Sequence, residues 1–428
     1  MSKLSVTAFL ALCGLAMGAP GGAHADLPLQ TVYSFCAQSG CADGFQPNAL
    51  VADGAGNFYG TARSGGRNNG GVAFELVFNG TGYDYRKLYD FCAIGFCQQG
   101  PNPTGKLVRD VHGNLYGTTF WGGRHGFGMA FELLPRSERR PWKLVKLHNF
   151  CGAADCTDGK NPQAALSYQG AETGIPYDGV SPLYGTTSLG GAHGGGVVFQ
   201  LTPRSNKQHA KEKVLHAFCR LSACVDGRAP IADVIVDALG NLYGTTPVGG
   251  AFNAGTVFGL SPRPNGYVET VLHSFCAVTT CAEGNTPNDG VIMDASGDLL
   301  GAAATGGQLG RGTLFRLTPN GASSPFTVIY NFCSGPNCND GQVPNGHLVL
   351  DADGDIFGTT AYGGAGSLGT VFELHGATLS TLFQFCDCAD GNTPRTGVFL
   401  DADGDLFGTT SAGGAHDPNG GTVFKVNR

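Results

Sequence analysis

Seven loops that each contain a Gly-Gly pair carry most of the side chains that could bind a ligand. Aromatic and cationic residues in these loops suit stacking on sugar rings and paired hydrogen bonds to anionic groups. The candidates are Arg63, Arg67, Trp121, Arg124, His125, His193, Arg311, Tyr362 and His416. Because they differ from loop to loop while the flanking sequence stays fixed, we predict the binding site here. The alternative is that they are solvated loop residues with no ligand.

The chain contains no string that is specific for one reaction, such as a nucleophile elbow, a phosphate-binding loop or an HExxH zinc motif. The leading hypothesis is therefore a non-catalytic binding or scaffold protein whose partner is a glycan or an extracellular protein. The competing hypothesis is an enzyme, for example a lyase or a glycoside-acting hydrolase, with acid and base groups drawn from His125, His193 and His416. No catalytic residue, cofactor or metal ion is assigned.

Acidic residues recur shortly after the cysteines, and six of them could gather a cation on one face. They are Asp43, Asp158, Asp226, Glu283, Asp340 and Asp390. We favour a different role, in which each opens an Asp-Gly turn, because a feature found in nearly every repeat usually serves the repeat.

Two other patterns suggest metal ligands but have simpler explanations. The string DADGD at 351–355 and 401–405 looks like the start of an EF-hand, yet the later glutamate and the flanking helices are missing, so we predict hairpin turns. His148, His216 and His273 each stand three residues before a cysteine. Strand alternation would turn the histidine and the cysteine to opposite faces, so we predict packing residues rather than zinc ligands.

The first 25 residues have the features of a secretory signal. Lys3 is followed by an apolar run and then by Ala23-His24-Ala25, which predicts cleavage after Ala25. Cysteines behind such a signal are expected to form disulfides. Fourteen of them fall into seven adjacent pairs: Cys36 with Cys41, Cys92 with Cys97, Cys151 with Cys156, Cys219 with Cys224, Cys276 with Cys281, Cys333 with Cys338, and Cys386 with Cys388. We therefore predict a secreted or periplasmic protein.

The cysteine pairs recur every 53 to 68 residues, and the sequence between them repeats in the same order. A proline and a short apolar strand lead to a D-x-x-G turn, the string LYGTT or a relative, the Gly-Gly loop, a strand like GTVFEL, and a last strand ending in Phe-Cys. Four strands per unit predict a seven-bladed antiparallel β-propeller, because the coils of a β-helix are much shorter. The units begin near Pro47, Pro103, Pro162, Pro230, Pro287, Pro344 and Pro394, within one domain at 26–428.

The two ends of the repeat array predict how the ring closes. The mature chain starts with a lone strand, QTVYSF, and its last unit has only three strands. If the N-terminal strand completes the last blade, no sheet edge is left open. Strand alternation then places the cysteine loops and the Gly-Gly loops on one face of the disc.

The strings GNLYGTT-x-x-GG at 113–123 and 240–250 and GTVF at 421–424 resemble the GloVer tandem repeats of bacterial secreted proteins, often labelled choice-of-anchor. The resemblance extends over essentially the whole mature chain and implies an exported repeat protein of unestablished activity. Repeat five departs from it with LLGAAATGG at 299–307, and repeat three carries extra residues around 172–178.

The overall composition excludes several other classes of protein. The chain is 42% hydrophobic with a net charge of only −7, which does not fit a disordered chain. An acidic total gives no reason to expect nucleic acid as a partner. Beyond the signal no segment is apolar for 18 residues, so no membrane span is predicted. We expect a monomer.

Overall fold

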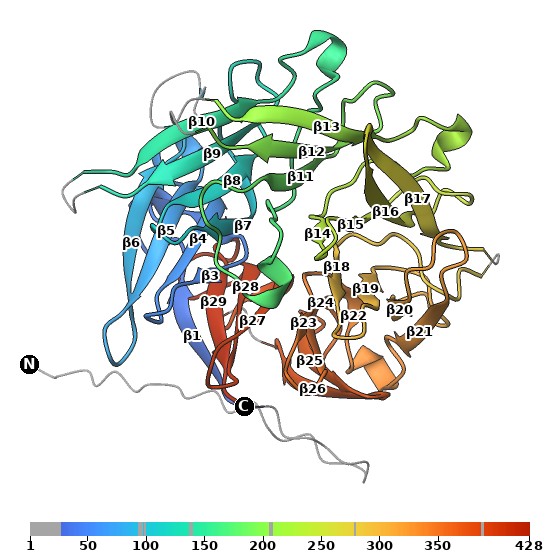
Figure 1. Ribbon diagram of the computed structural model, residues 1–428. Helices are drawn as coiled ribbons and strands as arrows, with labels where there is room; N and C mark the ends of the chain where they lie inside the picture. The colour runs from blue at the N-terminus through green and yellow to red at the C-terminus, as the bar shows by residue number, and fades with distance from the viewer. Residues whose placement is uncertain are drawn as a thin grey trace, which may run out of the picture.

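The computed structural model describes residues 27–428 except 93–96, 98–99, 137–139, 205–208, 278–279 and 387–388. Seven antiparallel sheets surround a central axis, and these residues contain no α-helix (Figure 1). The predicted seven-bladed β-propeller is therefore confirmed. The predicted signal at 1–25 lies outside the described residues.

Blades one to three follow the repeat order, with the first strand of each repeat next to the axis. Blade one contains β2 (Phe45–Pro47), β3 (Val51–Ala52), β4 (Phe58–Ser64), β5 (Val72–Phe78) and β6 (Tyr83–Asp90). Blade two contains β7 (Pro103–Arg109), β8 (Leu115–Thr119), β9 (Met129–Leu134) and β10 (Lys143–Asn149). Blade three contains β11 (Leu183–Thr187), β12 (Val197–Thr202) and β13 (Lys211–Ala217). Its innermost segment pairs with β11 only through an isolated bridge between Ser167 and Tyr184.

Blades four to seven complete the ring. Blade four contains β14 (Ile235–Val236), β15 (Leu242–Thr246), β16 (Thr256–Arg263) and β17 (Gly266–Ser274). Blade five contains β18 (Val291–Met293), β19 (Leu299–Ala303), β20 (Thr313–Leu317) and β21 (Phe326–Asn331). Blade six contains β22 (Gln342–Pro344), β23 (Val349–Leu350), β24 (Ile356–Tyr362), β25 (Thr370–His375) and β26 (Thr378–Gln384). Blade seven contains β27 (Asn392–Leu400), β28 (Leu406–Ala412) and β29 (Thr422–Val426).

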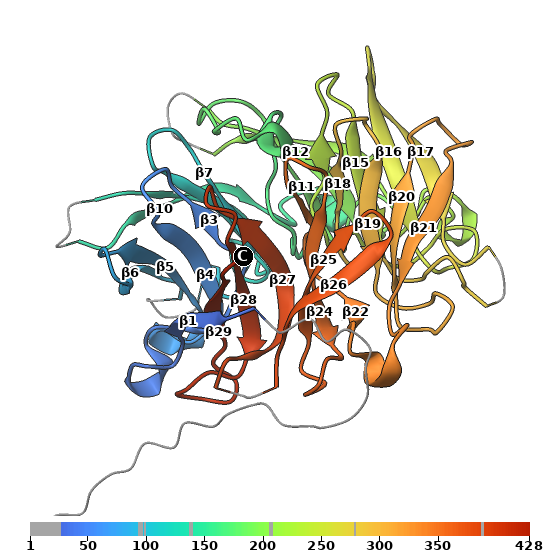
Figure 2. The same ribbon diagram turned by 90° about the horizontal axis from the view of Figure 1, so that it is seen from below.

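The fourth strand of blade seven is β1 (Leu29–Ser34), from the other end of the chain. It pairs antiparallel with β29, so that Leu29 faces Val426 and Ser34 faces Thr422. Figure 2 shows the two strands side by side. The prediction that the N-terminal strand completes the last blade is confirmed.

Short 3-10 turns lie in the loops. Four of them are in cysteine loops, one is in the Gly-Gly loop of blade one, and one is in the insertion of blade three. In that order they are η1 (Ser39–Cys41), η3 (Ala154–Cys156), η5 (Ser222–Cys224), η6 (Pro336–Cys338), η2 (Arg67–Asn69) and η4 (Ala171–Thr173).

Each blade packs on the next through a pair of phenylalanines. One follows the outermost strand, immediately before the cysteine pair, and the other lies on the third strand of the following blade. All fourteen rings are fully buried, and the centroids of each pair are 5.0 to 5.4 Å apart. The pairs are Phe35 with Phe74, Phe91 with Phe131, Phe150 with Phe199, Phe218 with Phe258, Phe275 with Phe315, Phe332 with Phe372, and Phe385 with Phe424.

The glycine of LYGTT lets the second of these rings approach its own blade. A Cβ atom at Gly185 would lie only 2.6 Å from the Phe199 ring, and the equivalent glycines in the other blades meet the equivalent rings. The ring therefore covers the backbone of the second strand directly. This contact explains why the glycine recurs in every repeat, including the divergent repeat five.

Six of the seven predicted disulfides form within their pairs, and each closes a loop on the face that also carries the Gly-Gly loops. The bridges are Cys36–Cys41, Cys92–Cys97, Cys151–Cys156, Cys219–Cys224, Cys276–Cys281 and Cys333–Cys338. The seventh pair includes Cys388, which lies outside the described residues. Such bridges are typical of proteins that fold outside the reducing cytoplasm.

The bridges of blades two and five complete loops of which only a part is described. Residues 93–96 and 278–279 lie outside the described ranges, whereas the second cysteines of these loops, Cys97 and Cys281, are described. Both have a left-handed backbone, with φ of 48° and 46°. The second cysteine of each of the other four bridges has a φ of 50° to 55°, so all six loops end in the same backbone conformation.

We predict that Phe258→Ala lowers the free energy of unfolding by about 3–5 kcal/mol, because it removes a fully buried ring from a blade interface. Phe252→Ala is the matched control in the same blade, since the Phe252 side chain is 53% exposed. It should change stability by less than about 0.5 kcal/mol. Urea unfolding followed by fluorescence measures both, and equal midpoints would contradict the role assigned to the interface.

We predict that the double substitution Cys219→Ser/Cys224→Ser costs about 2 kcal/mol of stability without loss of the fold, because the bridge closes a short loop. Thermal unfolding with and without reductant measures the effect. The variant should lose part of the sensitivity to reductant that the parent protein shows, and an unchanged response would argue against a contribution from this bridge.

Candidate functional site

The structure places all nine predicted binding residues at exposed positions in or beside the Gly-Gly loops. His125, His193 and His416 belong to blades two, three and seven, and no hydrogen bond or ion pair joins them among the described residues. None of the three lines the central channel. The three histidines named in the competing enzyme hypothesis are thus not brought together.

Tyr362 is the predicted loop residue that reaches the channel wall. Arg395 Nη2 donates a hydrogen bond of 3.0 Å to Tyr362 Oη, and its guanidinium lies 5.9 Å from the centre of the tyrosine ring. Arg395 itself lines the channel. This pair therefore marks the place where the face of the Gly-Gly loops meets the channel.

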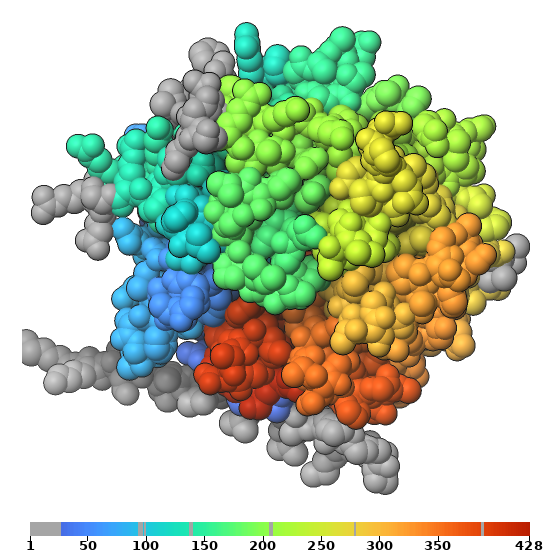
Figure 3. Space-filling model, in the orientation of Figure 1, coloured from blue at the N-terminus to red at the C-terminus, as the bar shows by residue number. Residues whose placement is uncertain are grey.

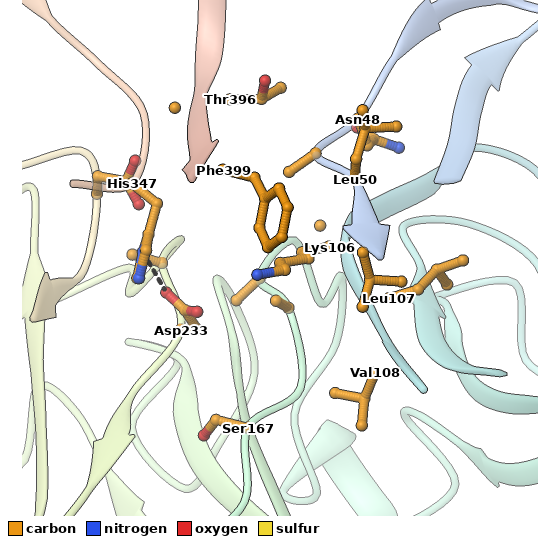
Figure 4. A pocket seen from close by; sticks show the side chains of 18 of the residues that line it. Asn48, Leu50, Lys106, Leu107, Val108, Ser167, Asp233, His347, Thr396 and Phe399 are labelled. Atoms are coloured by element: carbon orange, nitrogen blue, oxygen red, sulfur yellow. Dashed lines mark ion pairs between the residues drawn. The ribbon is translucent and has the colours of Figure 1, made fainter. Parts of the chain in front are cut away.

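The innermost strands enclose a cavity of about 400 Å³ on the axis of the ring. All seven blades contribute to its wall, and ten of the lining residues are labelled in Figure 4. The wall combines apolar side chains such as Leu107 and Phe399 with amides, carboxylates and cationic groups. A cavity of this size falls within the range of small-molecule sites.

One position on the innermost strands distinguishes the blades from each other. In each blade a buried aliphatic residue of the innermost segment lies opposite the glycine of LYGTT, and the position in question comes immediately before that residue. The strand registers show that this position is equivalent in all seven blades. From blade one to blade seven it is Ala49, Lys106, Ala165, Asp233, Gly290, His347 and Gly397. Four blades fold with alanine or glycine there, so the scaffold does not require the three ionisable side chains.

The ionisable side chains converge inside the channel. Figure 4 shows Lys106 extending across it toward the ion pair of Asp233 and His347, whose Oδ1 and Nδ1 atoms are 3.8 Å apart. Burial lowers the pKa of His347, but the negative charges of Asp233 and Asp289 have the larger effect. The pKa of His347 is therefore raised above its ordinary value. Burial lowers the pKa of Lys106, although the negative charge of Asp233 acts in the opposite direction. Burial also raises the pKa of Asp289.

The insertion of blade three adds a carboxylate to this group. Its turn η4 brings Ala171 and Glu172 into the cavity wall on the face opposite the Gly-Gly loops. Gln169 Nε2 binds the carbonyl oxygen of Ala238 in blade four at 3.0 Å, and Tyr177 forms a bridge to blade two. The insertion reaches the centre of that face in Figures 1 and 3, where it is green. Its extra length was visible in the sequence, whereas its destination was not.

The acidic residues after the cysteines serve the scaffold, as the turn interpretation predicted. Five of them accept a backbone N–H from the residue after the first cysteine, at 2.6 to 3.0 Å. These are Asp43, Asp158, Asp226, Glu283 and Asp340. The three histidines that precede the cysteines face the acids in blades three to five at 3.2 to 3.8 Å and pack against phenylalanines.

The two DADGD strings form hairpin turns. Asp351 Oδ1 accepts hydrogen bonds from the backbone N–H groups of Asp353 and Asp355. In the second string Asp401 Oδ1 accepts hydrogen bonds from the backbone N–H groups of Asp403 and Asp405. Asp53, Asp237 and Asp294 make equivalent turns in other blades. The turn interpretation is therefore confirmed at both strings.

A sequence model of the Gloeobacter/Verrucomicrobia repeat matches this chain three times, over residues 23–181, 174–292 and 264–428. The chain belongs to the Gloeobacter/Verrucomicrobia repeat family. No curated protein matches this family member. Within its described residues no helix is long and apolar enough to cross a membrane.

Comparison with solved structures gives matches to this Gloeobacter/Verrucomicrobia repeat protein at low identity. A protein from Lactobacillus plantarum is 13% identical over 85% of this chain and 88% of that chain, with a TM-score of 0.49. The β-propeller domain of Cps50 (Swd1) from Myceliophteria thermophila is 11% identical over 89% of this chain and 100% of that chain, with a TM-score of 0.47. The α-L-arabinanase of Penicillium chrysogenum is 12% identical over 94% of this chain and 99% of that chain, with a TM-score of 0.46.

Two carboxyls outside the channel should make the stability of this repeat protein depend on pH. Burial, with smaller contributions from neighbouring carboxylates, raises the pKa of Glu212 and of Glu269 from 4.5 to about 7. Each folded-state pKa exceeds the unfolded value, so the stability that the protonated carboxyls provide is lost as the pH rises from about 4.5 to about 7.

We predict that Glu212→Gln/Glu269→Gln matches the parent protein in stability near pH 4.5 and exceeds it at pH 8. The gain should be about 1 kcal/mol per site, because both side chains are partly open to solvent. Asp84→Asn, which removes an exposed carboxylate from β6, is the control and should show no such gain in stability at pH 8. Denaturation midpoints measured across this pH range test the prediction, and parallel pH profiles of all three proteins would refute it.

Proposed function

We propose that this Gloeobacter/Verrucomicrobia repeat protein is an exported binding module that holds the end of a glycan, or a similar polyhydroxylated molecule, in its central channel. The observation that carries the proposal is the placement of Lys106, Asp233 and His347 at a channel position where the other blades have alanine or glycine. Ionisable groups that the scaffold does not need, gathered in a cavity of suitable size, favour a ligand site.

The chemistry of the channel wall suits a sugar. Carboxylates, an ammonium group and the amides of Asn288 and Asn345 offer both acceptors and donors for hydroxyl groups. Phe399 adds an aromatic face beside Lys106, on which the apolar side of a sugar ring can stack (Figure 4). The combination of charged hydrogen-bonding groups with an aromatic face is less suited to a purely apolar ligand.

The Gly-Gly loops provide the second part of the proposed site. A chain whose end lies in the channel would pass Arg395 and Tyr362 and continue over the loop face, where Trp121 and Arg124 are exposed. Proposed export rests on the signal-like residues 1–25 and agrees with the six local disulfides. We further propose that the protein acts as a monomer.

A glycan and metabolite binding screen on the mature protein tests this function. Lys106→Ala and Asp233→Ala should each weaken binding of a hit at least tenfold, because a hydrogen bond to a charged group contributes about 1.5–3 kcal/mol. Neither should lower the melting temperature, since Ala49 and Ala165 occupy the same position in blades one and three.

Trp121→Ala and Arg124→Ala are compared in the same assay. They should weaken binding of long glycans more than binding of short ones. Unchanged affinity in both channel variants would place the ligand outside the channel and overturn the proposal. Conversion of the bound ligand to a product would replace it with the enzyme hypothesis.

A further inference from the structure

Three potential metal ligands from adjacent blades meet in the channel. They are Asp233 of blade four, Asp289 of blade five and His347 of blade six, and one carboxylate oxygen or ring nitrogen from each lies within 4.8 Å of the other two. Their side chains are partly accessible from the cavity. A single cation between them would be within ligating reach after small rotations of the side chains.

Two of the three side chains lack other hydrogen-bonding partners. The distance of 3.8 Å between Asp233 Oδ1 and His347 Nδ1 is that of an ion pair and is too long for a hydrogen bond. Among the described residues no hydrogen bond is made by the Asp233 carboxylate or by the His347 ring. The Asp233 carboxylate oxygens and the His347 ring nitrogens therefore remain available to bind a ligand in the channel.

Neighbouring blades contact the segments that carry these three residues. A Cβ atom at Gly290 would lie 2.8 Å from Asp233 Oδ1, so the glycine of blade five leaves the space that this carboxylate occupies. The hydroxyl of Thr245 donates to the carbonyl oxygen of Asp289 at 2.7 Å. The segment at His347 forms a parallel bridge with Gly397. The backbone at Asp289 and at His347 is thus fixed by a neighbouring blade, and Gly290 leaves room for the Asp233 carboxylate.

We infer that Asp233, Asp289 and His347 form a binding site for one divalent first-row metal ion, such as Zn²⁺ or Mn²⁺. One imidazole nitrogen and two carboxylate oxygens suit these ions, whereas Ca²⁺ prefers six to eight oxygen ligands. The carboxylate of Glu172 and the ammonium group of Lys106 lie nearby and interact with each other and with Asp233. Three protein ligands leave positions open toward the cavity for water or a ligand hydroxyl.

Titration of the untagged mature protein with the metal alone tests the inference. After treatment with a chelator, calorimetry with ZnCl₂ and electron paramagnetic resonance with MnCl₂ should both show one ion per chain. His347→Ala and Asp289→Asn should each weaken binding at least tenfold, because each removes one of three ligands. Thermal unfolding should show that both variants remain folded.

His375→Ala is the matched control, because His375 Nδ1 pairs with Asp355 Oδ1 at 2.7 Å on an exposed strand end and does not line the channel. It should bind the ion like the parent protein. Absence of stoichiometric binding, preference for Ca²⁺, or equal loss in the control and the channel variants would overturn the inference. Metal binding is measured without a glycan, so its failure and the failure of the proposed function are distinguishable.

Discussion

The contact of one phenylalanine with another across each blade interface is the interaction on which the rest of the structure depends. The fourteen rings are fully buried and the seven pairs have nearly equal separations. Burial of such a ring contributes about 1.5–3 kcal/mol, and the edge-on or tilted contact between the rings adds to that. A ring of blades closes when the rotations from one blade to the next add up to a full turn, and seven similar contacts favour similar rotations.

Residues repeated in most blades and residues unique to one blade have different roles. The repeated acids, glycines and cysteines shape loops and interfaces. Repeated threonines of blades two and three connect the second strand to the innermost segment of the next blade, which lines the channel. Thr118 and Thr186 each donate to a carbonyl oxygen on the innermost segment of the next blade, at Ala164 and Ala232. The wall of the channel is thereby positioned by the scaffold, while single side chains such as Lys106 are free to differ.

The fold could be predicted because its determinants recur seven times. Strand order, blade number, ring closure and six cysteine pairs all follow from periodic signals in the sequence. The channel residues could not be predicted in the same way, because each occurs once and no periodic signal singles it out. Lys106, Asp233 and His347 each stand three residues after the proline of their repeat, so the sequence aligns them, but it does not show that they meet. Blade one lacks one residue between Pro47 and Leu50, so that Ala49 aligns with Lys106 only once the strands are paired. The location of Glu172 depends on how the insertion crosses the ring, which no local pattern specifies.

The pairing of β1 with β29 has a consequence for how the molecule is made. The first strand is synthesised before all seven blades and its partner after six of them, so β1 has no neighbouring strand until β29 is made. A chain that stops before residue 422 keeps two unpaired strand edges, and such edges readily recruit strands from other copies. Ring closure therefore acts as a check on completeness: a finished molecule is sealed, whereas a truncated one is prone to exchange strands or aggregate.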